Sequence, residues 1–453
     1  MKSFSARATA AAILRRVLEG ESLNHLLPGA LGDAPEAQRP LCRELIYGTL
    51  REWPYLEALC LGYLTKPLRN KDGDIKALLC AGLYELSHLS TPAHAALSET
   101  VEAARHLQKP WATGLINGVL RNYQRTRQHD LSETTAPEQQ GIQANPTKAA
   151  PSASLSPAQR RALPEWLHRA FHLTYGDHIE SIAQASRSRP PMALRVNRAR
   201  ILREEYLQLL EDQGVAASAH AALPDAVLLE QGVDVRQLPG FTEGLVSVQD
   251  CAAQHVADII APQPDERILD ACAAPGGKAC HLLERQSRLL ALVASDVSEN
   301  RLARLEENRA RLGLTMDLQV ADAAHPPPEW LATPFDAIVA DVPCSATGVL
   351  RRNPDVKLLR RESDVEGFQQ QQLAILEGLW HALKPGGRLL YVTCSLLDEE
   401  NDSVVSAFCE QRDVDVEPVQ LAIGIRRQSG WQTLPRVDDG DGLYFSLLRK
   451  PGL

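Results

Sequence analysis

The chain contains 453 residues, 44% of them hydrophobic and 23% charged, and its formal net charge is −9. This length predicts two or three domains, and the composition is that of an ordinary soluble globular protein, not of a disordered or fibrous one. No stretch approaches the ~18 uninterrupted apolar residues that a membrane-spanning helix needs, which excludes a protein built on such helices.

The nine cysteines are an odd number, and they include no Cys-x-x-Cys pair and no clustered zinc spacing. This pattern favours free thiols in a reducing compartment over a disulfide framework or a metal knuckle. We therefore predict a cytoplasmic protein that holds no metal. Most of the cysteines are interpreted as small buried hydrophobic residues, namely Cys42, Cys60, Cys80, Cys251, Cys280 and Cys409.

The negative charge is unevenly distributed. Residues 1–127 contain 16 Lys and Arg against 12 Asp and Glu, an excess of +4, so the remainder carries −13. Two basic runs also stand out: residues 187–203 hold six arginines and no acid, and residues 351–361 hold five basic residues against Asp355. Such runs either contact phosphates or form a solvated face, and the sequence leaves both interpretations open.

Residues 1–127 are predicted to be a helical bundle with its own core. Apolar residues recur at helix-face spacing in residues 75–86 and 97–104, and prolines separate the segments. Arg15 and Arg16 interrupt the apolar part of the first segment, which argues for a folded helix and against a targeting peptide. Its buried face is predicted to consist of Ala10, Ile13, Leu14, Val17 and Leu18.

Residues 128–158 are predicted to be a flexible linker. They contain four prolines, many Ser, Thr, Gln and Ala residues, and no aromatic residue. Such a segment buries too little apolar surface to offset its ordering entropy. Residues 159–245 are predicted to form a small α+β domain, with a strand at Met192–Val196 and a helix around residues 204–212.

Residues 246–453 alternate between apolar runs and helical stretches. The apolar runs lie at 267–271, 289–295, 318–320, 335–340 and 388–392, and helices at 299–312 and 369–383 separate some of them. This alternation predicts a Rossmann-like α/β domain with a mostly parallel sheet and helices on both faces. Ligands of such sheets bind at the carboxyl ends of the strands.

A turn of small residues follows the first strand of this α/β domain and opens a helix. Small residues let the backbone approach a ligand closely, and the start of a helix offers unpaired N–H groups. A purely structural use of glycine is the alternative. The turn is predicted to bind a cofactor through Cys272, Ala273, Ala274, Pro275, Gly276, Gly277 and Lys278.

Acids follow the next three strands. Asp296 is placed to accept both hydroxyls of a ribose, Asp322 to accept from an adenine amino group, and Asp341 ends the fourth strand. Three acids would repel a diphosphate but suit a nucleoside that carries a sulfonium, and the chain has no GxxxxGK[ST] phosphate loop. The set therefore predicts S-adenosylmethionine in preference to NAD or ATP, with helix capping as the alternative.

Cys344 and Cys394 each end a predicted strand beside this turn. Either one alone could be a core residue, but with the acids they indicate methylation of a pyrimidine ring carbon. A thiolate that adds to carbon 6 makes the ring an enamine, whose carbon 5 can attack a sulfonium methyl before a base removes its proton. Asp341, protonated or sharing a proton, could hydrogen-bond ring nitrogen 3 and stabilise the charge pushed there.

At these residues the chain resembles the RNA cytosine-5 methyltransferases, and within them the bacterial small-subunit ribosomal RNA methyltransferase B family. The resemblance covers nearly the whole chain. Besides the turn and the two thiol phrases, it rests on four segments: SVQD at 247–250, RNPDVK at 352–357, LKPGG at 383–387 and DGDGLYF at 439–445.

The resemblance implies a role for each of these groups. Cys394 would be the nucleophile at carbon 6 and Cys344 would assist release of the methylated base, while the turn and the three acids would bind S-adenosylmethionine. Residues 1–127 would be a NusB-like RNA-binding bundle, and the middle domain would grip RNA through Arg195 and its neighbours. The linker at 128–158 is longer than the family pattern.

The expected activity is transfer of a methyl group to carbon 5 of a cytidine in small-subunit (16S) ribosomal RNA, by a monomer. Two alternatives remain at this point: the same chemistry on transfer RNA or another RNA, and an inert NusB-like RNA-binding factor. The acids and both thiols argue against the inert factor.

Overall fold

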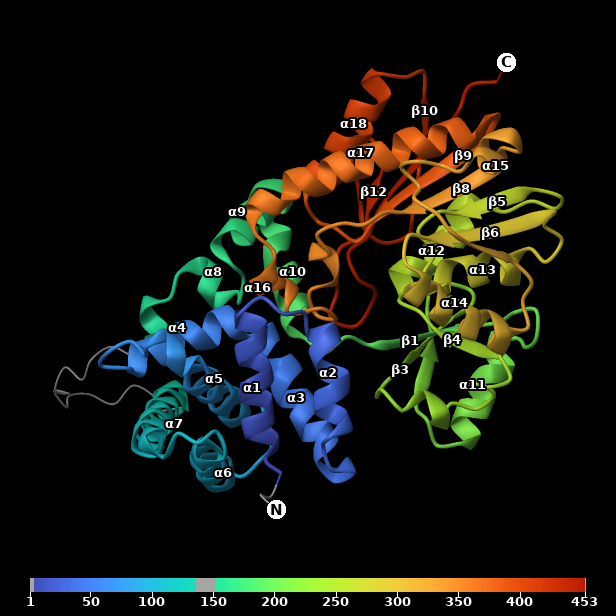
Figure 1. The fold of residues 1–453 in the computed structure, drawn as a ribbon. Helices are drawn as coiled ribbons and strands as arrows, with labels where there is room; N and C mark the ends of the chain where they lie inside the picture. Colours follow the sequence, from blue (N-terminus) through green and yellow to red (C-terminus); the bar gives the residue numbers. More distant parts are fainter. Residues whose placement is uncertain (1–3, 136–150, 453) are drawn as a thin grey trace. The chain divides into compact units, whose positions relative to one another are not determined.

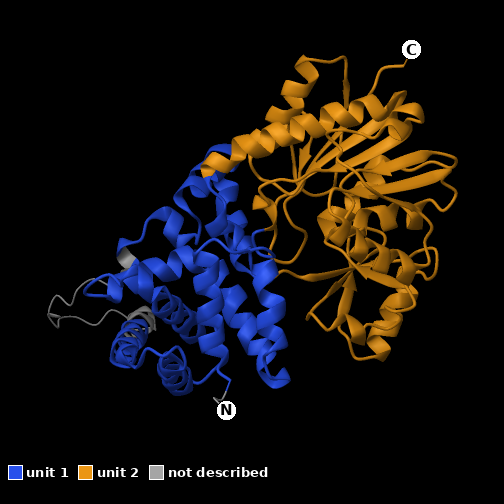
Figure 2. Cartoon of the chain, viewed as in Figure 1, with its two compact units in different colours: residues 1–189, 350–361 blue, residues 190–349, 362–453 orange. Residues whose placement is uncertain are grey.

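The computed structural model describes residues 4–135 and 151–452, which form two compact units (Figure 2). Unit 1 consists of Met1–Arg189 and Leu350–Arg361, and unit 2 of Pro190–Val349 and Glu362–Leu453. The chain therefore leaves unit 2 after Val349, contributes a short segment to unit 1 and returns at Glu362. No helix in the described ranges has both the length and the apolar character that crossing a membrane requires.

The first part of unit 1 is helical, as predicted for residues 1–127. The Ser5 hydroxyl caps the first helix by accepting a hydrogen bond from the Ala8 N–H at 3.3 Å. The predicted stripe in the fifth helix is buried, since Ile75, Leu78 and Leu83 are 0% exposed. The helices are α1 (Ala6–Leu18), α2 (Leu23–Gly32), η1 (Glu36–Gln38), α3 (Arg39–Arg51), α4 (Trp53–Tyr63), η2 (Asn70–Asp72), α5 (Gly73–His88), α6 (Ala93–His106), η3 (Pro110–Ala112) and α7 (Thr113–Thr135).

The second part of unit 1 overlaps the predicted linker. Residues 128–135 continue α7, and residues 136–150 lie outside the described part of the chain, so flexibility there stays a prediction. The segment 350–361 adds one short helix to this unit. The elements are η4 (Pro151–Ser154), α8 (Pro157–Arg160), α9 (Glu165–Tyr175), η5 (Gly176–His178), α10 (Ile179–Arg187) and α16 (Val356–Leu359).

Unit 2 begins with a four-stranded antiparallel sheet in the order β2-β3-β1-β4. The predicted strand and helix are confirmed as β1 (Met192–Val196) and α11 (Arg203–Asp212). Tyr206 and Leu210 of α11 pack into one cluster with Leu194 and Val227 of the sheet, which explains why the helix lies on it. The other elements are β2 (Ala217–Ala219), β3 (Ala226–Leu229), η6 (Val235–Gln237) and β4 (Val246–Val248).

The larger sheet of unit 2 has nine strands in the order β11-β12-β13-β9-β8-β5-β6-β7, with β10 paired to β13. Strands β5 to β9 are parallel to one another, and β13 is antiparallel to β9, so the predicted mostly parallel sheet is confirmed. The strand order reverses at β5 and β8, the place where open parallel sheets bind ligands. The strands are β5 (Arg267–Asp270), β6 (Ala291–Asp296), β7 (Asp317–Val320), β8 (Phe335–Asp341), β9 (Leu383–Thr393), β10 (Asp415–Glu417), β11 (Ile425–Arg426), β12 (Trp431–Gln432) and β13 (Tyr444–Arg449).

Helices cover both faces of this sheet because successive side chains of a strand point to opposite sides. Ile268 packs with residues of α12, α13 and α14, whereas its neighbour Leu269 packs with residues of α15, α17 and α18. Figure 1 shows α17 running along one side of β8 and β9, with α12 and α13 on the other. The elements are α12 (Cys251–Ile260), α13 (Gly277–Arg285), α14 (Glu299–Leu312), α15 (Pro328–Ala332), η7 (Thr347–Val349), η8 (Glu362–Asp364), α17 (Val365–Ala382), η9 (Asp398–Glu400) and α18 (Asp402–Glu410).

Candidate active site

The parallel strands of unit 2 bring the predicted site residues to one edge of the sheet. Asp296 is the last residue of β6 and Asp341 the last of β8, while Cys394 directly follows β9. These strands and β5 run in one direction within one sheet, so their carboxyl ends lie along a common edge. Acids and thiols that are far apart in the sequence therefore meet there.

The turn 272–278 connects β5 to α13 and depends on glycine. Gly276 has a φ of +97°, a left-handed conformation that L side chains rarely adopt, and a Cβ there would lie 2.6 Å from Cγ of Leu305. Its N–H donates to the Ala273 carbonyl at 2.7 Å, which closes the turn. Because α13 begins at Gly277, its first N–H groups have no acceptor inside the helix, and the Ala279 N–H lies by the Asp270 carboxylate.

Arg195 of β1 supports this turn. Its Nη1 donates to the Gly277 carbonyl at 2.8 Å and to Oε1 of Gln249 at 2.5 Å. Nε and Nη2 donate to the two carboxylate oxygens of Glu284, each at 2.8 Å. The side chain is 1% exposed. The expectation that Arg195 grips RNA is therefore wrong, because its guanidinium is paired inside the protein and cannot reach a phosphate.

Asp296 offers a buried acceptor beside the turn. Its side chain is 2% exposed, and Oδ1 accepts a hydrogen bond from the Ser298 N–H at 3.0 Å. Arg301 lies 3.2 Å from Oδ2, but that oxygen accepts no hydrogen bond from the described residues. Arg301 also donates to the Ala274 carbonyl at 3.0 Å and so ties the strand end to the turn. A buried carboxylate oxygen with unused capacity fits the ribose diol of a nucleoside cofactor.

Asp322, which follows β7, is the most open of the predicted acids, with a side chain 52% exposed. Its carboxylate accepts from the Ala324 N–H at 3.0 Å and pairs with Nδ1 of His325 at 2.9 Å. The hydrogen bond with His325 holds the pKa of Asp322 below its usual value. The carboxylate is therefore ionised and accessible, and its contact with an adenine stays a prediction.

Asp270, the last residue of β5, was missed by the sequence analysis. It is 0% exposed, and neither carboxylate oxygen has a well-formed hydrogen bond from the described residues. Burial raises its pKa to about 7, although the nearby Lys278 opposes the shift. The signal was present, since Asp270 ends a strand as Asp296 and Asp341 do.

Lys278 and Asp341 form an ion pair at the centre of this edge. Nζ of Lys278 lies 2.5 Å from Oδ2 of Asp341, and the lysine side chain is 16% exposed. Burial alone would lower the pKa of Lys278, but the charge of Asp341 and its hydrogen bond raise it above the usual value, with Asp270 and Cys394 contributing. The raised pKa keeps the proton on Nζ of Lys278, and the expected role of Asp341 at ring nitrogen 3 stays a prediction.

The two predicted thiols are in contact: Sγ of Cys344 lies 3.3 Å from Sγ of Cys394. Cys344 is 9% exposed, whereas Cys394 is half-buried. The hydrogen bond with Cys394 raises the pKa of Cys344 well above its usual value, and burial and the charges of Cys394 and Glu400 add to the effect. Cys344 therefore keeps its proton and can donate it to the more open sulfur of Cys394.

The loop after Cys344 has an unusual backbone. Ala346 has a φ of +62°, and a left-handed non-glycine residue costs about 1–2 kcal/mol, a strain that collects at functional sites. The Gly348 N–H donates to the Cys394 carbonyl at 2.9 Å, and the Gly442 N–H donates to the Gly348 carbonyl at 3.0 Å. A Cβ at position 348 would lie 2.0 Å from the Gly442 oxygen, so only glycine lets the two cysteine loops and the tail approach so closely.

The other cysteines are also free thiols, as predicted, because none of the nine forms a disulfide. Cys272 in the turn is half-buried, and burial followed by the charges of Asp341, Asp270 and Asp296 raises its pKa. Cys409 is half-buried, and the remaining five are buried.

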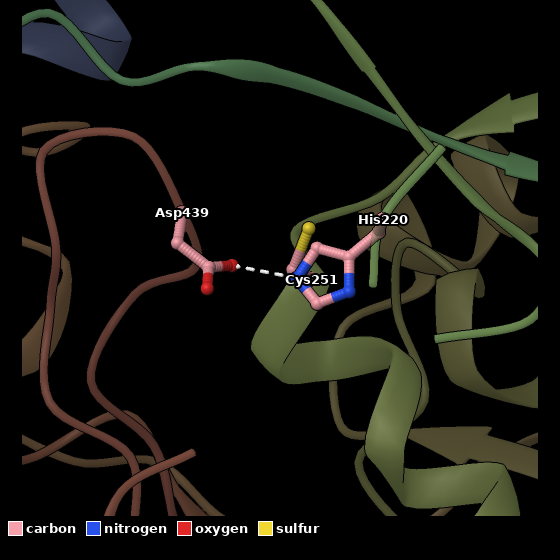
Figure 3. Close-up of side chains that lie close together, drawn as sticks. All are labelled: His220, Cys251 and Asp439. Carbon is pink, nitrogen blue, oxygen red and sulfur yellow. Dashed lines mark hydrogen bonds and ion pairs between the residues drawn. The ribbon is translucent and has the colours of Figure 1, made fainter. Parts of the chain in front are cut away.

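His220, Cys251 and Asp439 form a separate cluster that has the residue types of a metal site, with ligand atoms within 4.8 Å of one another (Figure 3). Nδ1 of His220 accepts hydrogen bonds from the N–H groups of Ala222 and Leu223, both at 3.1 Å. The neutral ring therefore carries its proton on Nε2, which donates to Asp439 at 3.1 Å. A proton on Nε2 leaves no lone pair there for a metal ion, so a hydrogen bond joins His220 to Asp439. That the chain holds no metal stays a prediction.

Several arginines and lysines of the two predicted basic runs are buried or bind groups within their own unit. Arg187 pairs with Glu52 at 2.8 Å, and Arg200 donates to the Leu312 carbonyl at 2.5 Å. In the second run, Arg351 is 1% and Lys357 2% exposed. The sequence could not show this, because the partners of these cations lie far away in the chain.

Comparison with known proteins agrees with this arrangement. Three family patterns match: "16S rRNA methyltransferase RsmB/F" over residues 257–449, "NusB family" over 5–125, and "Methyltr_RsmF/B-like, ferredoxin-like domain" over 163–236. The chain is 43% identical over 451 residues to the "Ribosomal RNA small subunit methyltransferase B" of Pseudomonas syringae, covering 98% of this chain and 96% of that protein. It is 42% identical over 445 residues to the protein of the same name from Vibrio cholerae, covering 98% and 97%.

Solved structures share the fold. A methyltransferase homologue from Pyrococcus horikoshii has a TM-score of 0.58 and 26% sequence identity, and the match covers 65% of this chain and all of that one, 100%. Similarity over almost the whole length, together with the three family patterns in their order along the chain, establishes that this chain belongs to the ribosomal RNA small subunit methyltransferase B family.

Proposed function

We propose that this protein transfers a methyl group from S-adenosylmethionine to carbon 5 of a cytidine in small-subunit (16S) ribosomal RNA, through a covalent bond between Cys394 and carbon 6. The observation that carries the proposal is the contact of Cys344 and Cys394, 3.3 Å apart at Sγ, at the strand ends that also hold the Lys278–Asp341 pair. The named relatives are small-subunit methyltransferases, which supports the choice of RNA.

The turn and the strand-end acids would hold the cofactor. The N–H groups of Gly277 and Lys278 at the start of α13 and the open oxygen of Asp296 would bind the nucleoside, and Asp322 is exposed enough to meet its base. S-adenosylmethionine would supply the electrophilic methyl group. Arg195 and Arg301 keep the turn in place by binding the carbonyl groups of Gly277 and Ala274.

Cys394 starts the reaction by adding to carbon 6 as a thiolate, which moves the electron pair of the 5,6 double bond towards nitrogen 3. A cation beside a thiolate stabilises its negative charge, and the charge of Cys394 contributes to the raised pKa of Lys278. The ammonium of Lys278, held beside Asp341, would stabilise the negative charge that develops at nitrogen 3. Carbon 5 then becomes the nucleophile that takes the methyl group.

Cys344 completes the cycle. Its pKa is raised first by the hydrogen bond with Cys394 and also by the charge of that residue. Both causes end when the Cys394 sulfur is bound to carbon 6, so Cys344 releases its proton to solvent more readily. The resulting thiolate takes the proton of carbon 5, the bond between carbon 6 and sulfur breaks, and the Cys394 thiolate leaves.

The remaining expectations form part of the same proposal. The helical segment 1–127 and the small α+β segment 159–245 would bind the RNA, with the linker 128–158 between them and the catalytic segment 246–453 after them. The NusB and ferredoxin-like matches support this division. We expect a monomer that works in the cytoplasm, where its nine free thiols stay reduced.

A pair of cysteine variants tests the proposal. Cys394→Ala should abolish transfer of tritiated methyl to small-subunit RNA while cofactor binding persists. Cys344→Ala should slow release and accumulate a protein–RNA adduct that survives denaturation. Cys409→Ala on α18 serves as the matched control and should behave as the unmodified protein.

Full methyl transfer by Cys394→Ala would exclude it as the nucleophile, and the absence of an adduct with Cys344→Ala would remove that residue from the release step. Bisulfite mapping of RNA from a deletion strain identifies the target. Loss of a methylated cytidine from transfer RNA in place of ribosomal RNA would redirect the proposal to that substrate.

A further inference from the structure

A buried carboxylate lies between the two cysteine loops. Glu400 belongs to η9, after β9, and is 0% exposed. The proposed chemistry uses the two cysteines but gives no role to this acid. A fully buried carboxylate is costly unless its oxygens are satisfied, so its partners indicate what it does.

Four hydrogen bonds satisfy the carboxylate. Oε1 accepts from the Ser345 N–H at 2.8 Å and from Nε2 of Gln372 at 3.1 Å. Oε2 accepts from the hydroxyls of Ser345 and Ser395, each at 2.5 Å. All four donors are neutral, so hydrogen bonds alone satisfy both oxygens of this carboxylate inside the protein.

The two serines occupy matching places in the site. Ser345 directly follows Cys344, and Ser395 directly follows Cys394. One carboxylate oxygen therefore joins the residues next to the two sulfurs. Gln372 extends this connection, because its Nε2 also donates to the Pro343 carbonyl at 2.9 Å, on the other side of Cys344.

The neighbouring residue holds the second loop in the same way. Nδ2 of Asn401 donates to the Ser395 carbonyl at 3.0 Å, and its Oδ1 accepts from the Thr393 hydroxyl at 2.6 Å. The residues before and after Cys394 are thus both tied to η9 and the start of α18. Little freedom remains in the separation of the sulfurs.

We propose that Glu400 is a positioning residue, which clamps the Cys344 and Cys394 loops together and holds the two sulfurs at the separation that adduct formation and release require. The inference rests on the proposed function. Misplacing reacting groups by about 1 Å lowers a rate on the order of 100-fold, so loosening one bond of this clamp should be measurable.

The charge of Glu400 has a second effect, on the thiol that completes the reaction. The hydrogen bond with Cys394 is the main cause of the raised pKa of Cys344, followed by burial and the charge of Cys394, and the charge of Glu400 raises it further. Once Cys394 is bound to the base, burial and Glu400 remain. Together with burial, the charge of Glu400 therefore contributes to the pH at which Cys344 becomes able to take the carbon 5 proton.

Two variants separate position from charge. Ser395→Ala removes one donor to Oε2 and leaves the charge of Glu400, so the rates of adduct formation and methyl transfer should fall about 10-fold with an unchanged pH profile. Glu400→Gln removes the charge while an amide oxygen can still accept from Ser345 and Gln372. Its pH profile of adduct release should move to lower pH, a shift that a merely structural residue would not produce.

A measurement that needs no methyl transfer distinguishes this proposal from the proposed function. Diamide oxidises two neighbouring thiols to a disulfide and takes up both electrons and both protons, so the rate of Cys344–Cys394 cross-linking in the full chain reports the separation of the sulfurs. We expect cross-linking about 10-fold slower in Ser395→Ala than in the unmodified chain. Ser406→Ala and Glu410→Gln, both on α18, are the matched controls.

If Ser395→Ala cross-links at a rate within about twofold of the Ser406→Ala control, the positioning role is wrong. The Ser395→Ala result decides this question even when Glu400→Gln does not fold. An unshifted pH profile in folded Glu400→Gln would overturn the charge effect. If the unmodified chain fails to methylate any RNA, the proposed function is wrong, and the cross-linking rates still decide whether Glu400 positions the thiols.

Discussion

Two lysines, one in each compact unit, are removed from solvent in different ways. Lys278 of unit 2 pairs with the carboxylate of Asp341 at 2.5 Å, and the pKa of the lysine is raised. Among the described residues, Lys357 of unit 1 donates to neutral oxygens: the carbonyls of Arg51 at 2.7 Å and Ala162 at 3.1 Å, and the Ser186 hydroxyl at 3.2 Å. Burial lowers its pKa to about 7.

The comparison shows that burial of a charge does not by itself mark a functional site. Lys278 stays charged next to an acid and a thiol, at the strand ends where open parallel sheets bind ligands. Lys357 is 2% exposed and joins backbone segments of unit 1, so its role is to hold that unit together. The charge of the group that each lysine binds, and not its depth of burial, distinguishes Lys278 from Lys357.

The largest expected effect comes from removing the charge at the site. Lys278→Met should lower the rate of methyl transfer about 100- to 1,000-fold, because a group that stabilises developing charge is lost. Tritium transfer to small-subunit RNA measures the rate. Lys357→Met is the matched control, and equal losses in the two variants would break the distinction between them.

A smaller effect is expected on stability in unit 1. The folded pKa of Lys357, about 7, lies below the value of 10.5 for the exposed group, so between these values the unfolded chain binds a proton that the folded chain lacks. Stability therefore rises with pH across this window and is insensitive to Lys357 below it. From pH 7 to pH 9 this lysine should add about 2 kcal/mol to the rise.

Lys357→Met removes this contribution. Urea unfolding at both pH values, with hydrogen exchange of α5 peptides as the local probe of unit 1, gives the difference between the variant and the unmodified chain. Parallel pH dependences in the two proteins would mean that Lys357 is charged when folded.

The smallest effect is expected on cofactor affinity, when a third buried cation, Arg195, is replaced. Arg195 is paired with Glu284, as Lys278 is with Asp341, but it acts on the turn through the Gly277 carbonyl. Arg195→Lys keeps the charge but cannot bind two groups with a planar fork. Cofactor affinity, measured by calorimetry, should fall about 10-fold, or about 1.4 kcal/mol, while RNA affinity stays unchanged. Weaker RNA binding with unchanged cofactor affinity would restore the original expectation for Arg195.

Much of the fold could be predicted because hydrophobic periodicity is local. The stripe at Ile75, Leu78 and Leu83 is buried in α5, and the predicted strand at Met192–Val196 is β1. The alternation of strands and helices after residue 246 correctly predicts the mostly parallel sheet. The segment 350–361 could not be assigned in this way, since nothing in its sequence shows that it packs with unit 1.

Part of the candidate site could be predicted by the same reasoning. Parallel strands place their carboxyl ends together, so the rule that selected Asp296, Asp341 and the two cysteines also applies to Asp270. The family resemblance assigned Arg195 to RNA, and its partners Glu284 and Gly277 lie too far away in the sequence to show otherwise. Glu400 gave no signal, because its donors Ser345 and Gln372 come from distant segments.

The order of residues along the chain alone determined the succession of helices and strands, the turn that only glycine permits, and the two Cys-Ser phrases at strand ends. These follow from backbone sterics and from the periodic burial of apolar side chains, which act over a few neighbouring residues. The tertiary structure alone decided which cation meets which anion, because electrostatic and hydrogen-bond partners depend on distance in space. That choice pairs Lys278 with Asp341, turns Arg195 inward and places Glu400 between the two cysteine loops.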